Sequence, residues 1–221
     1  AVAAGCRDEL LCLVERLDAI YLYTALAKGL LPDDHPQNLG WGSGSEELVQ
    51  EVFDRADVVL VVGSSLDEAD TTQWRLRLPD NLIQIDTEEP IIGRSYPIAL
   101  GILGDAKLTL THLLAILPLQ KQGSKAAAQV AKYKARVRQQ EQDTPGWRFM
   151  DAIHQAVPAD AIVTNDASTV NGWAIRFLPR SLPRTFNITR NLGALGYAFP
   201  AALGAKVACP DRQAMAIVGD G

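Results

Sequence analysis

The sequence predicts an α/β protein with two doubly wound, Rossmann-like domains, each built on a parallel sheet. Segments of helical periodicity alternate with short apolar runs along the chain, a pattern typical of α/β folds. Residues 58–62 are an uninterrupted Val/Leu run, which indicates a parallel strand covered on both faces. Residues 119–146 are polar and charged instead. This change predicts a linker with a charged helix between a first domain at 1–118 and a second domain at 147–221.

The first domain is predicted to contain three helices and four strands. Ser45 and Asp105 mark two helix starts, because short side chains that carry an oxygen cap the exposed backbone N–H groups there. Residues 40–44 are rich in glycine but follow no strong strand, so we interpret them as a loop and not as a dinucleotide-binding turn. The helices are expected at 8–17, 45–56 and 105–117, and the strands at 19–24, 57–62, 81–86 and 98–103.

The second domain is predicted to follow Thr144-Pro145-Gly146, which we interpret as the end of the linker helix. Pro200 suits the first turn of a helix, where its missing N–H leaves no hydrogen bond unmade. The Lys and Arg residues of the linker are interpreted as a solvated helix face, with a basic binding surface as the alternative. Helices are expected at 149–157, from Ser168 onward and in the alanine-rich segment with Pro200; strands are expected at 161–164, 185–188 and 214–218.

Charge and composition argue against several classes of protein. The chain has 21 basic and 26 acidic residues, a net charge of −5, which disfavours nucleic acid or an anionic membrane surface as the partner. No apolar stretch is long enough to cross a bilayer. The N-terminal residues lack the basic-then-apolar layout of a secretory signal, so we expect a cytoplasmic protein. Three scattered cysteines and three distant histidines form no zinc-binding pattern.

Two glycine-containing turns are the candidate binding elements. Gly193 and Gly196 permit backbone conformations that other residues resist. The run 214–218 leads into Gly219-Asp220-Gly221, and ligands of α/β sheets bind at the carboxyl ends of strands. Glycines at that place let backbone N–H groups approach phosphate oxygens, and Asp220 offers a carboxylate oxygen to Mg²⁺. An ordinary tight turn is the alternative explanation for this tripeptide.

Three stretches of the sequence carry a resemblance to a known family. They are Gly193-Ala-Leu-Gly-Tyr-Ala-Phe-Pro-Ala-Ala-Leu-Gly-Ala205 with Ile217-Val-Gly-Asp-Gly221, Ala27-Lys-Gly-Leu-Leu-Pro-Asp-Asp-His-Pro36, and Asn165-Asp-Ala-Ser-Thr169. In them the chain resembles the thiamine diphosphate-dependent 2-oxo acid enzymes, which include acetolactate synthase and benzoylformate decarboxylase. The resemblance extends over essentially the whole chain. It implies that residues 1–118 are most of the family's middle domain and that residues 147–221 are a truncated diphosphate-binding domain.

The resemblance also implies a cofactor site. Asp220 is implied to ligate the Mg²⁺ that bridges the two phosphates, and Leu195 to prop the cofactor in its bent form. The carbonyl of Gly193 is implied to accept a hydrogen bond from the 4′-amino group of the cofactor. From the residues alone, N-capping explains Ser168 and Thr169 equally well. The complete implied set for thiamine diphosphate is Ser168, Thr169, Gly193, Ala194, Leu195, Gly219, Asp220 and Gly221.

The reaction implied by the resemblance is decarboxylation of a 2-oxo acid, with ligation of the product to a second carbonyl as a further outcome. The enzyme would be a lyase or transferase that forms a homodimer or homotetramer. No catalytic residue is assignable here, because the activating glutamate of the family belongs to a domain outside the resemblance, so we expect the chain alone to be inactive. FAD is a less favoured second cofactor, since residues 66–71 lack the arginine expected in flavin-binding acetolactate synthases. The alternatives are a non-catalytic nucleotide-binding module, with the nucleotide near residues 63–66 and Asp86, and an oligomerisation module.

Overall fold

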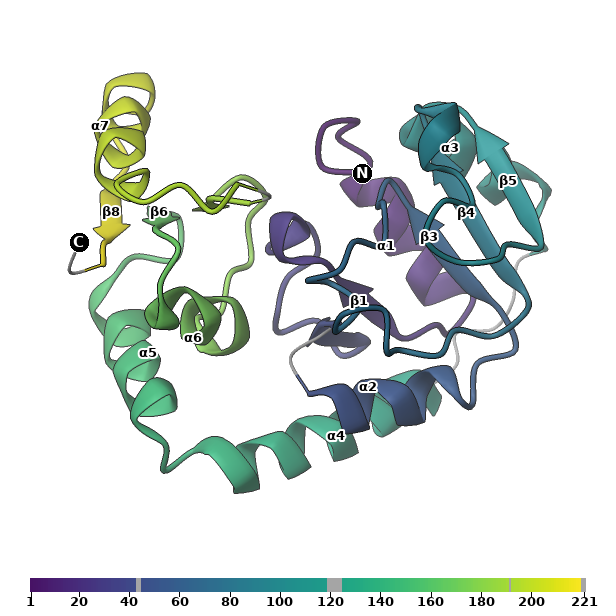
Figure 1. The fold of residues 1–221 in the computed structure, drawn as a ribbon, viewed down its shortest axis with the longest axis horizontal. Coiled ribbons are helices and arrows are strands. Elements are labelled where there is room, and N and C mark those ends of the chain that lie inside the picture. Colours follow the sequence, from purple (N-terminus) through teal and green to yellow (C-terminus); the bar gives the residue numbers. More distant parts are fainter. Residues whose placement is uncertain (43–44, 119–124, 191, 220–221) are drawn as a thin grey trace.

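The computed structural model describes residues 1–42, 45–118, 125–190 and 192–219, and it confirms the α/β class. The described strands all pair in parallel, in sheets of order β1-β2, β3-β4-β5 and β7-β6-β8. Figure 1 shows the first two sheets in one half of the molecule and the third in the other. We call these the N-terminal half and the C-terminal half.

The N-terminal half has its core between helices α1 and α3 and the strands. Leu10 and Leu13 of α1 and Leu110 of α3 pack in one cluster with Tyr21 and Ile85. The Asp105 carboxylate accepts a hydrogen bond from Leu108 N–H at 3.0 Å, as predicted for a helix cap. The elements are α1 (Arg7–Arg16), β1 (Tyr21–Tyr23), η1 (Ala25–Ala27), β2 (Asn38–Trp41), α2 (Glu46–Phe53), β3 (Val59–Val62), β4 (Leu82–Asp86), η2 (Glu89–Ile91), β5 (Leu100–Leu103) and α3 (Ala106–Ile116).

One prediction for this half is wrong, and a second holds only in part. Gly40 and Trp41 do not lie in a loop, because they belong to β2 and pair with Leu22 and Tyr23 of β1; residues 43 and 44 of the predicted loop lie outside the described residues. The Val/Leu run is covered only partly: Leu60 and Val62 pack against the core cluster, Val61 is buried, and Val58, just before β3, is exposed. Strand β3 is at the edge of its described sheet, with β4 as its one neighbour.

Helix α5, the first helix after the linker, begins earlier than the sequence predicts. Thr144 is the N-cap of α5, its hydroxyl accepts a hydrogen bond from Trp147 N–H at 3.3 Å, and Pro145 is the first helical residue. Thr144-Pro145-Gly146 therefore starts a helix instead of ending one, because proline is well tolerated where no helical N–H bond is required. The elements are α5 (Pro145–Ala156), β6 (Ile162–Asn165), α6 (Thr169–Phe177), β7 (Phe186–Ile188), α7 (Ala198–Ala208) and β8 (Ala214–Ile217).

Strand β6 is central in its sheet, and the direction of the connections reverses there. The chain passes through α6 to β7 on one side and returns through α7 to β8 on the other. Val163 packs with Met150 of α5 and Ile175 of α6, whereas the Thr164 hydroxyl donates to the Ala198 carbonyl of α7 at 2.7 Å. Helices α5 and α6 thus cover one face and α7 the other. In open α/β sheets, the carboxyl ends of strands at such a reversal form the ligand-binding crevice.

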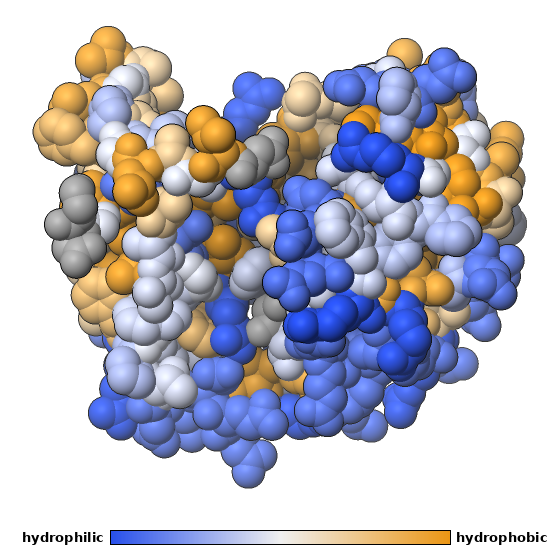
Figure 2. All heavy atoms as spheres, viewed as in Figure 1, coloured by the Kyte–Doolittle hydropathy of each residue, from blue (hydrophilic) through white to orange (hydrophobic). Residues whose placement is uncertain are grey.

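The linker helix α4 (Lys125–Glu141) connects the two halves along the lower edge of Figure 1. Tyr133 packs against Leu48 and Val52 of α2, and Arg136 forms an ion pair with Glu51 at 2.9 Å. Part of the charged face is therefore engaged with the N-terminal half, and Figure 2 shows a hydrophilic surface over α4 and α2. In the described part of the chain, no helix combines the length and apolarity that a membrane span requires.

Candidate functional site

The turn after β6 is fixed to the start of α7. Asp166, which is buried, accepts a hydrogen bond from the backbone N–H of Ala198 at 2.7 Å. Its own N–H donates to the Ile217 carbonyl of β8 at 3.0 Å. Together with the Thr164 hydroxyl, these bonds hold the carboxyl ends of β6 and β8 and the first residue of α7 in one place. The site is therefore built on rigid elements.

Ser168 lies directly after this turn, at the N-cap of α6. Its side chain makes no capping hydrogen bond, and its buried Oγ has no hydrogen-bond partner among the described residues. The simple N-capping explanation is thus wrong for the Ser168 side chain. A buried hydroxyl without a partner costs about 1–3 kcal/mol, so a ligand oxygen at this position would be stabilising. Thr169 is the first residue of α6 and is exposed.

The described parts of the three predicted cofactor segments converge on the same turn. A Cβ atom built on Gly193 would lie 3.9 Å from the Cβ of Ala167, and one built on Gly219 would lie 3.8 Å from the Cβ of Ser168. Gly193 and Gly196 have φ angles of +61° and +75°, which side chains disfavour. Asp220 and Gly221 lie outside the described residues. Gly219, the residue just before them, lies beside Ser168.

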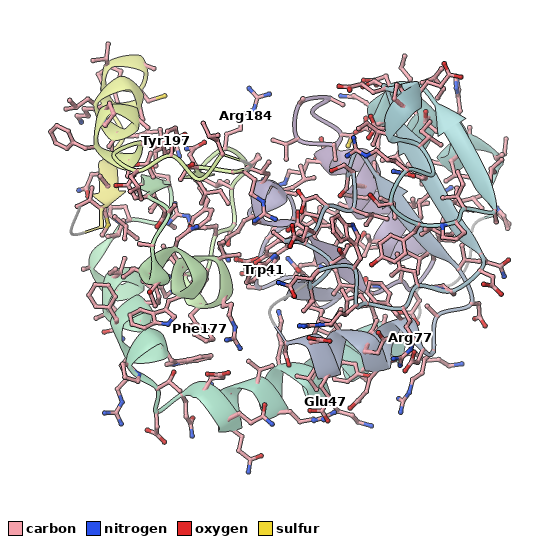
Figure 3. All side chains as sticks on the ribbon, viewed as in Figure 1. Trp41, Glu47, Arg77, Phe177, Arg184 and Tyr197 are labelled. Carbon is pink, nitrogen blue, oxygen red and sulfur yellow. The ribbon has the colours of Figure 1, made fainter. Side chains whose placement is uncertain are left out.

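Ala194 and Leu195 lie on the surface beside this turn. Leu195 is 73% exposed, and its neighbour Leu192 is exposed as well. Figure 3 labels Tyr197, where this stretch meets the start of α7. An exposed leucine at the edge of a candidate site is available to contact a ligand. The role of Leu195 as a prop for a cofactor stays a prediction.

Comparison with known families identifies the class of protein. The model of the thiamine pyrophosphate enzyme central domain matches residues 1–113. The model of the C-terminal TPP binding domain of thiamine pyrophosphate enzymes matches residues 166–221, which contain the convergent turn. The chain belongs to the thiamine pyrophosphate enzymes. Thiamine pyrophosphate is the same compound as thiamine diphosphate, so the predicted family is confirmed.

Curated relatives in this family cover all or nearly all of the chain. The protein named "Probable 2-ketoarginine decarboxylase AruI" of Pseudomonas aeruginosa is 37% identical over 226 residues, which cover 100% of this chain and 40% of that protein. The acetolactate synthase large subunit of Corynebacterium glutamicum is 29% identical over 232 residues, which cover 100% of this chain and 37% of that protein. Sulfoacetaldehyde acetyltransferase of Castellaniella defragrans is 28% identical over 251 residues, which cover 97% of this chain and 41% of that protein. The chain spans about 40% of the length of these relatives.

The residues present fit the diphosphate group of this family's cofactor. The start of α6 carries the positive end of the helix dipole, which attracts anions. Among the described residues the Ser168 hydroxyl has no hydrogen-bond partner, and Gly219 lies close enough to share a ligand with it. Potential hydrogen-bond donors at the carboxyl ends of β6 and β8 therefore lie side by side, as binding of a diphosphate group requires.

Sequence reasoning assigned no role to two asparagines near this turn. Asn165, the last residue of β6, is fully buried, and neither its amide oxygen nor its amide nitrogen has a hydrogen-bond partner among the described residues. Asn171, in the first turn of α6, has a buried Oδ1 in the same condition. Buried amides normally have partners. The signal for Asn165 was its place at the end of an apolar strand, directly before an aspartate.

The alternative nucleotide site in the N-terminal half receives less support from the geometry. The carbonyls of Ser64 and Ser65 accept hydrogen bonds from Gln84 and Ser95, at 3.0 and 2.8 Å. The Asp86 carboxylate accepts one from Glu88 N–H at 3.1 Å. These polar groups are thus engaged within the domain. The prediction that FAD is a less favoured cofactor stays a prediction.

A surface hollow of about 490 Å³ lies over α2, away from the turn after β6. Figure 3 labels Glu47 and Arg77 at this hollow. Its charged lining is mostly carboxylate, which repels an anionic diphosphate, so we do not assign the cofactor to it. The lining residues are Glu46, Glu47, Gln50, Glu51, Asp54, Arg75 and Arg77.

The far end of α6 is anchored to the N-terminal half by a buried lysine. The Lys28 ammonium donates to the Ile175 carbonyl at 2.9 Å, to the Asp33 carboxylate at 2.9 Å and to the Tyr23 hydroxyl at 2.8 Å. Burial lowers the pKa of Lys28, and the charge of Asp33 opposes that shift. Asp33 also accepts the backbone N–H of Arg180 at 2.9 Å. The helix that begins at Ser168 is therefore held at its other end by another part of the chain.

Proposed function

We propose that the protein is part of a thiamine diphosphate- and Mg²⁺-dependent enzyme that decarboxylates a 2-oxo acid. The observation that carries this proposal is the meeting of Ser168, Gly193 and Gly219 at the carboxyl end of β6, in a chain that belongs to the thiamine pyrophosphate enzymes. The relative named as a 2-ketoarginine decarboxylase supports decarboxylation. Relatives named as acetolactate synthases support ligation to a second carbonyl as a further outcome.

The cofactor, when bound, supplies a nucleophilic carbon and accepts the electron pair that remains after CO₂ leaves. The residues of this chain would bind and orient it. The Ser168 hydroxyl and the N–H groups of Thr169 and Gly219 would donate to phosphate oxygens. The Asp220 carboxylate would hold Mg²⁺, with Gly221 beside it, because Mg²⁺ prefers oxygen ligands.

The turn at residues 193–195 would serve the organic part of the cofactor. The Gly193 carbonyl would accept a hydrogen bond from the amino group, Ala194 would leave room for the ring, and Leu195 would support the bent conformation. None of these groups moves a proton, so no catalytic residue is assigned within this chain. We propose that the chain alone is inactive for that reason.

We also propose that the active protein is a homodimer or homotetramer. Phe199, Leu203 and Val207 are exposed at four-residue spacing along one side of α7, and Figure 2 shows an apolar surface over this helix at the upper left. A large exposed apolar patch is a surface that another chain would cover. Sedimentation of the protein at micromolar concentration tests the assembly, and a monomer at every concentration would contradict it.

Release of CO₂ from a panel of 2-oxo acids, including 2-ketoarginine and pyruvate, tests the proposed function. In the full-length protein, of which this chain is proposed to be a part, we expect release that requires both thiamine diphosphate and Mg²⁺. Leu195→Ala should lower turnover by about 100-fold, because a misplaced reacting group costs that much, with a smaller change in cofactor affinity. Leu192→Ala is the matched control, since Leu192 is an exposed leucine directly before the proposed cofactor-binding turn at 193–195. Cofactor-independent release, or equal turnover in both variants, would contradict the proposal.

A further inference from the structure

An ion pair joins the two halves of the molecule just before the glycine loop, which we define as residues 192–197. The Nη2 atom of Arg190 lies 2.7 Å from Oδ1 of Asp70 and 3.5 Å from Oδ1 of Asp67. The side chain of Arg190 is 15% exposed and that of Asp70 is 8% exposed. The pair is thus largely shielded from water and salt, and it constrains the chain more than a surface pair does.

Asp70 is a fixed point within the N-terminal half. Its Oδ1 also accepts hydrogen bonds from the backbone N–H of Ala25, at the start of η1, and from Nε1 of Trp41, at the end of β2, each at 3.3 Å. The Asp67 carboxylate accepts a hydrogen bond from the backbone N–H of Asp70 at 3.0 Å. This bond closes the turn that carries Asp70. Figure 3 shows Trp41 in the middle of the molecule, between the two halves. Three elements of the N-terminal half therefore position the acceptor of Arg190.

The glycine loop is fastened at its two ends in different ways. At the first end, the N–H of Leu192 donates to the carbonyl of Arg190 at 2.8 Å. At the second end, the N–H of Ala198 donates to Asp166 at 2.7 Å, inside the C-terminal half. Residues 192–196 are exposed between these ends. The first end thus depends on a residue that is tied to the N-terminal half.

We propose that Arg190 and Asp70 are positioning residues that set the glycine loop for cofactor binding. This role rests on the proposed function, which brings Gly193 and Leu195 to the cofactor. Without the Arg190 guanidinium, Asp70 keeps its hydrogen bonds to Ala25 and Trp41, but the first end of the glycine loop loses its ion pair with the N-terminal half. The N-terminal half thereby shapes the cofactor site without touching the cofactor.

Amide hydrogen exchange in the protein without cofactor tests this role independently of the proposed function. In Arg190→Met, the Leu192 amide should exchange about tenfold faster, the effect of losing a coupling typical of contacting residues. The Ala198 amide should be unchanged, because Asp166 still holds it. Arg190→Lys should restore part of the protection, since it keeps the charge. Arg148→Met is the matched control, because Arg148 pairs with Asp143 at 2.9 Å on the surface of the C-terminal half.

Calorimetric titration with thiamine diphosphate and Mg²⁺ then measures the consequence for the site. Arg190→Met and Asp70→Asn should each weaken cofactor affinity by about tenfold, and the double variant should weaken it no further, because the two residues act as one unit. Arg148→Met should bind like the unaltered protein. If the unaltered protein does not bind the cofactor, the proposed function fails, whereas the exchange result still decides the positioning role.

Two results would overturn the positioning role. One is unchanged exchange of the Leu192 amide in Arg190→Met. The other is a uniform acceleration at both Leu192 and Ala198 with no rescue by Arg190→Lys, which would make the ion pair a general tie between the halves. If Arg190→Met does not fold, the same comparison is made with Arg190→Lys and Asp70→Asn, which retain more of the native contacts.

Discussion

At the scale of single residues, the site is defined by polar groups that the fold leaves without partners. Ser168 stands at a helix start, yet its hydroxyl caps nothing among the described residues. Asp166, two residues earlier, accepts a hydrogen bond from the Ala198 N–H. The sequence placed both in one short stretch after a strand but did not distinguish their roles. Only the packing of α7 against β6 shows that Asp166 is structural and that Ser168 is available.

Ser168→Ala separates binding from stability. It should weaken thiamine diphosphate binding by at least about tenfold, because a hydrogen bond to a charged group contributes about 1.5–3 kcal/mol. It should leave the melting temperature unchanged or slightly higher, since Oγ has no partner to lose among the described residues. Ser95→Ala is the control: it should lower the melting temperature and leave cofactor affinity unchanged, because Ser95 donates a hydrogen bond to the Ser65 carbonyl at 2.8 Å.

Calorimetry and thermal unfolding of the two variants give the answer. A loss of stability in Ser168→Ala as large as that in Ser95→Ala, with unchanged cofactor affinity, would show that the Ser168 hydroxyl supports the fold instead of a ligand.

At the scale of elements, strand β1 buries two phenol groups beside the Lys28 network. Tyr21 and Tyr23 are buried in the main core of the N-terminal half. Burial, reinforced by the negative charge of Asp33, raises the pKa of both phenols above the ordinary value of 10.0. In the unfolded chain the phenols ionise near pH 10, whereas in the folded protein they keep their protons. Their contribution to stability is therefore complete below pH 10 and is lost as the pH rises above it.

We expect the protein to unfold in alkali through these tyrosines. Above pH 10, each should lower the free energy of unfolding by about 1.4 kcal/mol per pH unit. The lowered pKa of Lys28 acts in the opposite direction, but only below its ordinary value of 10.5. Ultraviolet absorbance of phenolate and circular dichroism, followed together, should show these two phenols ionising only as helix is lost. Tyr21→Phe should move the transition to higher pH. Full phenolate absorbance in a protein with native circular dichroism would contradict this.

The sequence predicted most elements, and the failures have local physical causes. Strand β2 was missed because Asn38-Leu39-Gly40-Trp41 is short and contains asparagine and glycine, which are depleted in strands, and its strand conformation comes from pairing with β1. The start of α5 was placed too late because proline and glycine indicate a break as well as a first turn. The Thr144 cap resolves that ambiguity. Helix α6 was predicted from Ser168, and it does begin there.

At the scale of the whole molecule, contacts between the halves were beyond sequence reasoning. Arg190 and Asp70 are far apart in the chain and occur in no shared motif, so nothing in the sequence pairs them. The same holds for the Lys28 ammonium and the Ile175 carbonyl, because a backbone acceptor carries no sequence signal. These two contacts secure the first end of the glycine loop and the last turn of α6. The motifs thus predict where a cofactor binds, and the three-dimensional fold shows what holds that place in shape.

The proposed function requires that a diphosphate group bind at the carboxyl ends of β6 and β8, against the start of α6 and the glycine loop. Residue-resolved hydrogen exchange with and without thiamine diphosphate and Mg²⁺ tests it most directly, with ADP and Mg²⁺ as the comparison. We predict slower exchange at residues 166–169, 192–197 and 217–219 with thiamine diphosphate, and no such change with ADP. Slower exchange at residues 63–66 and 84–88 instead, or none around Ser168, would contradict the claim.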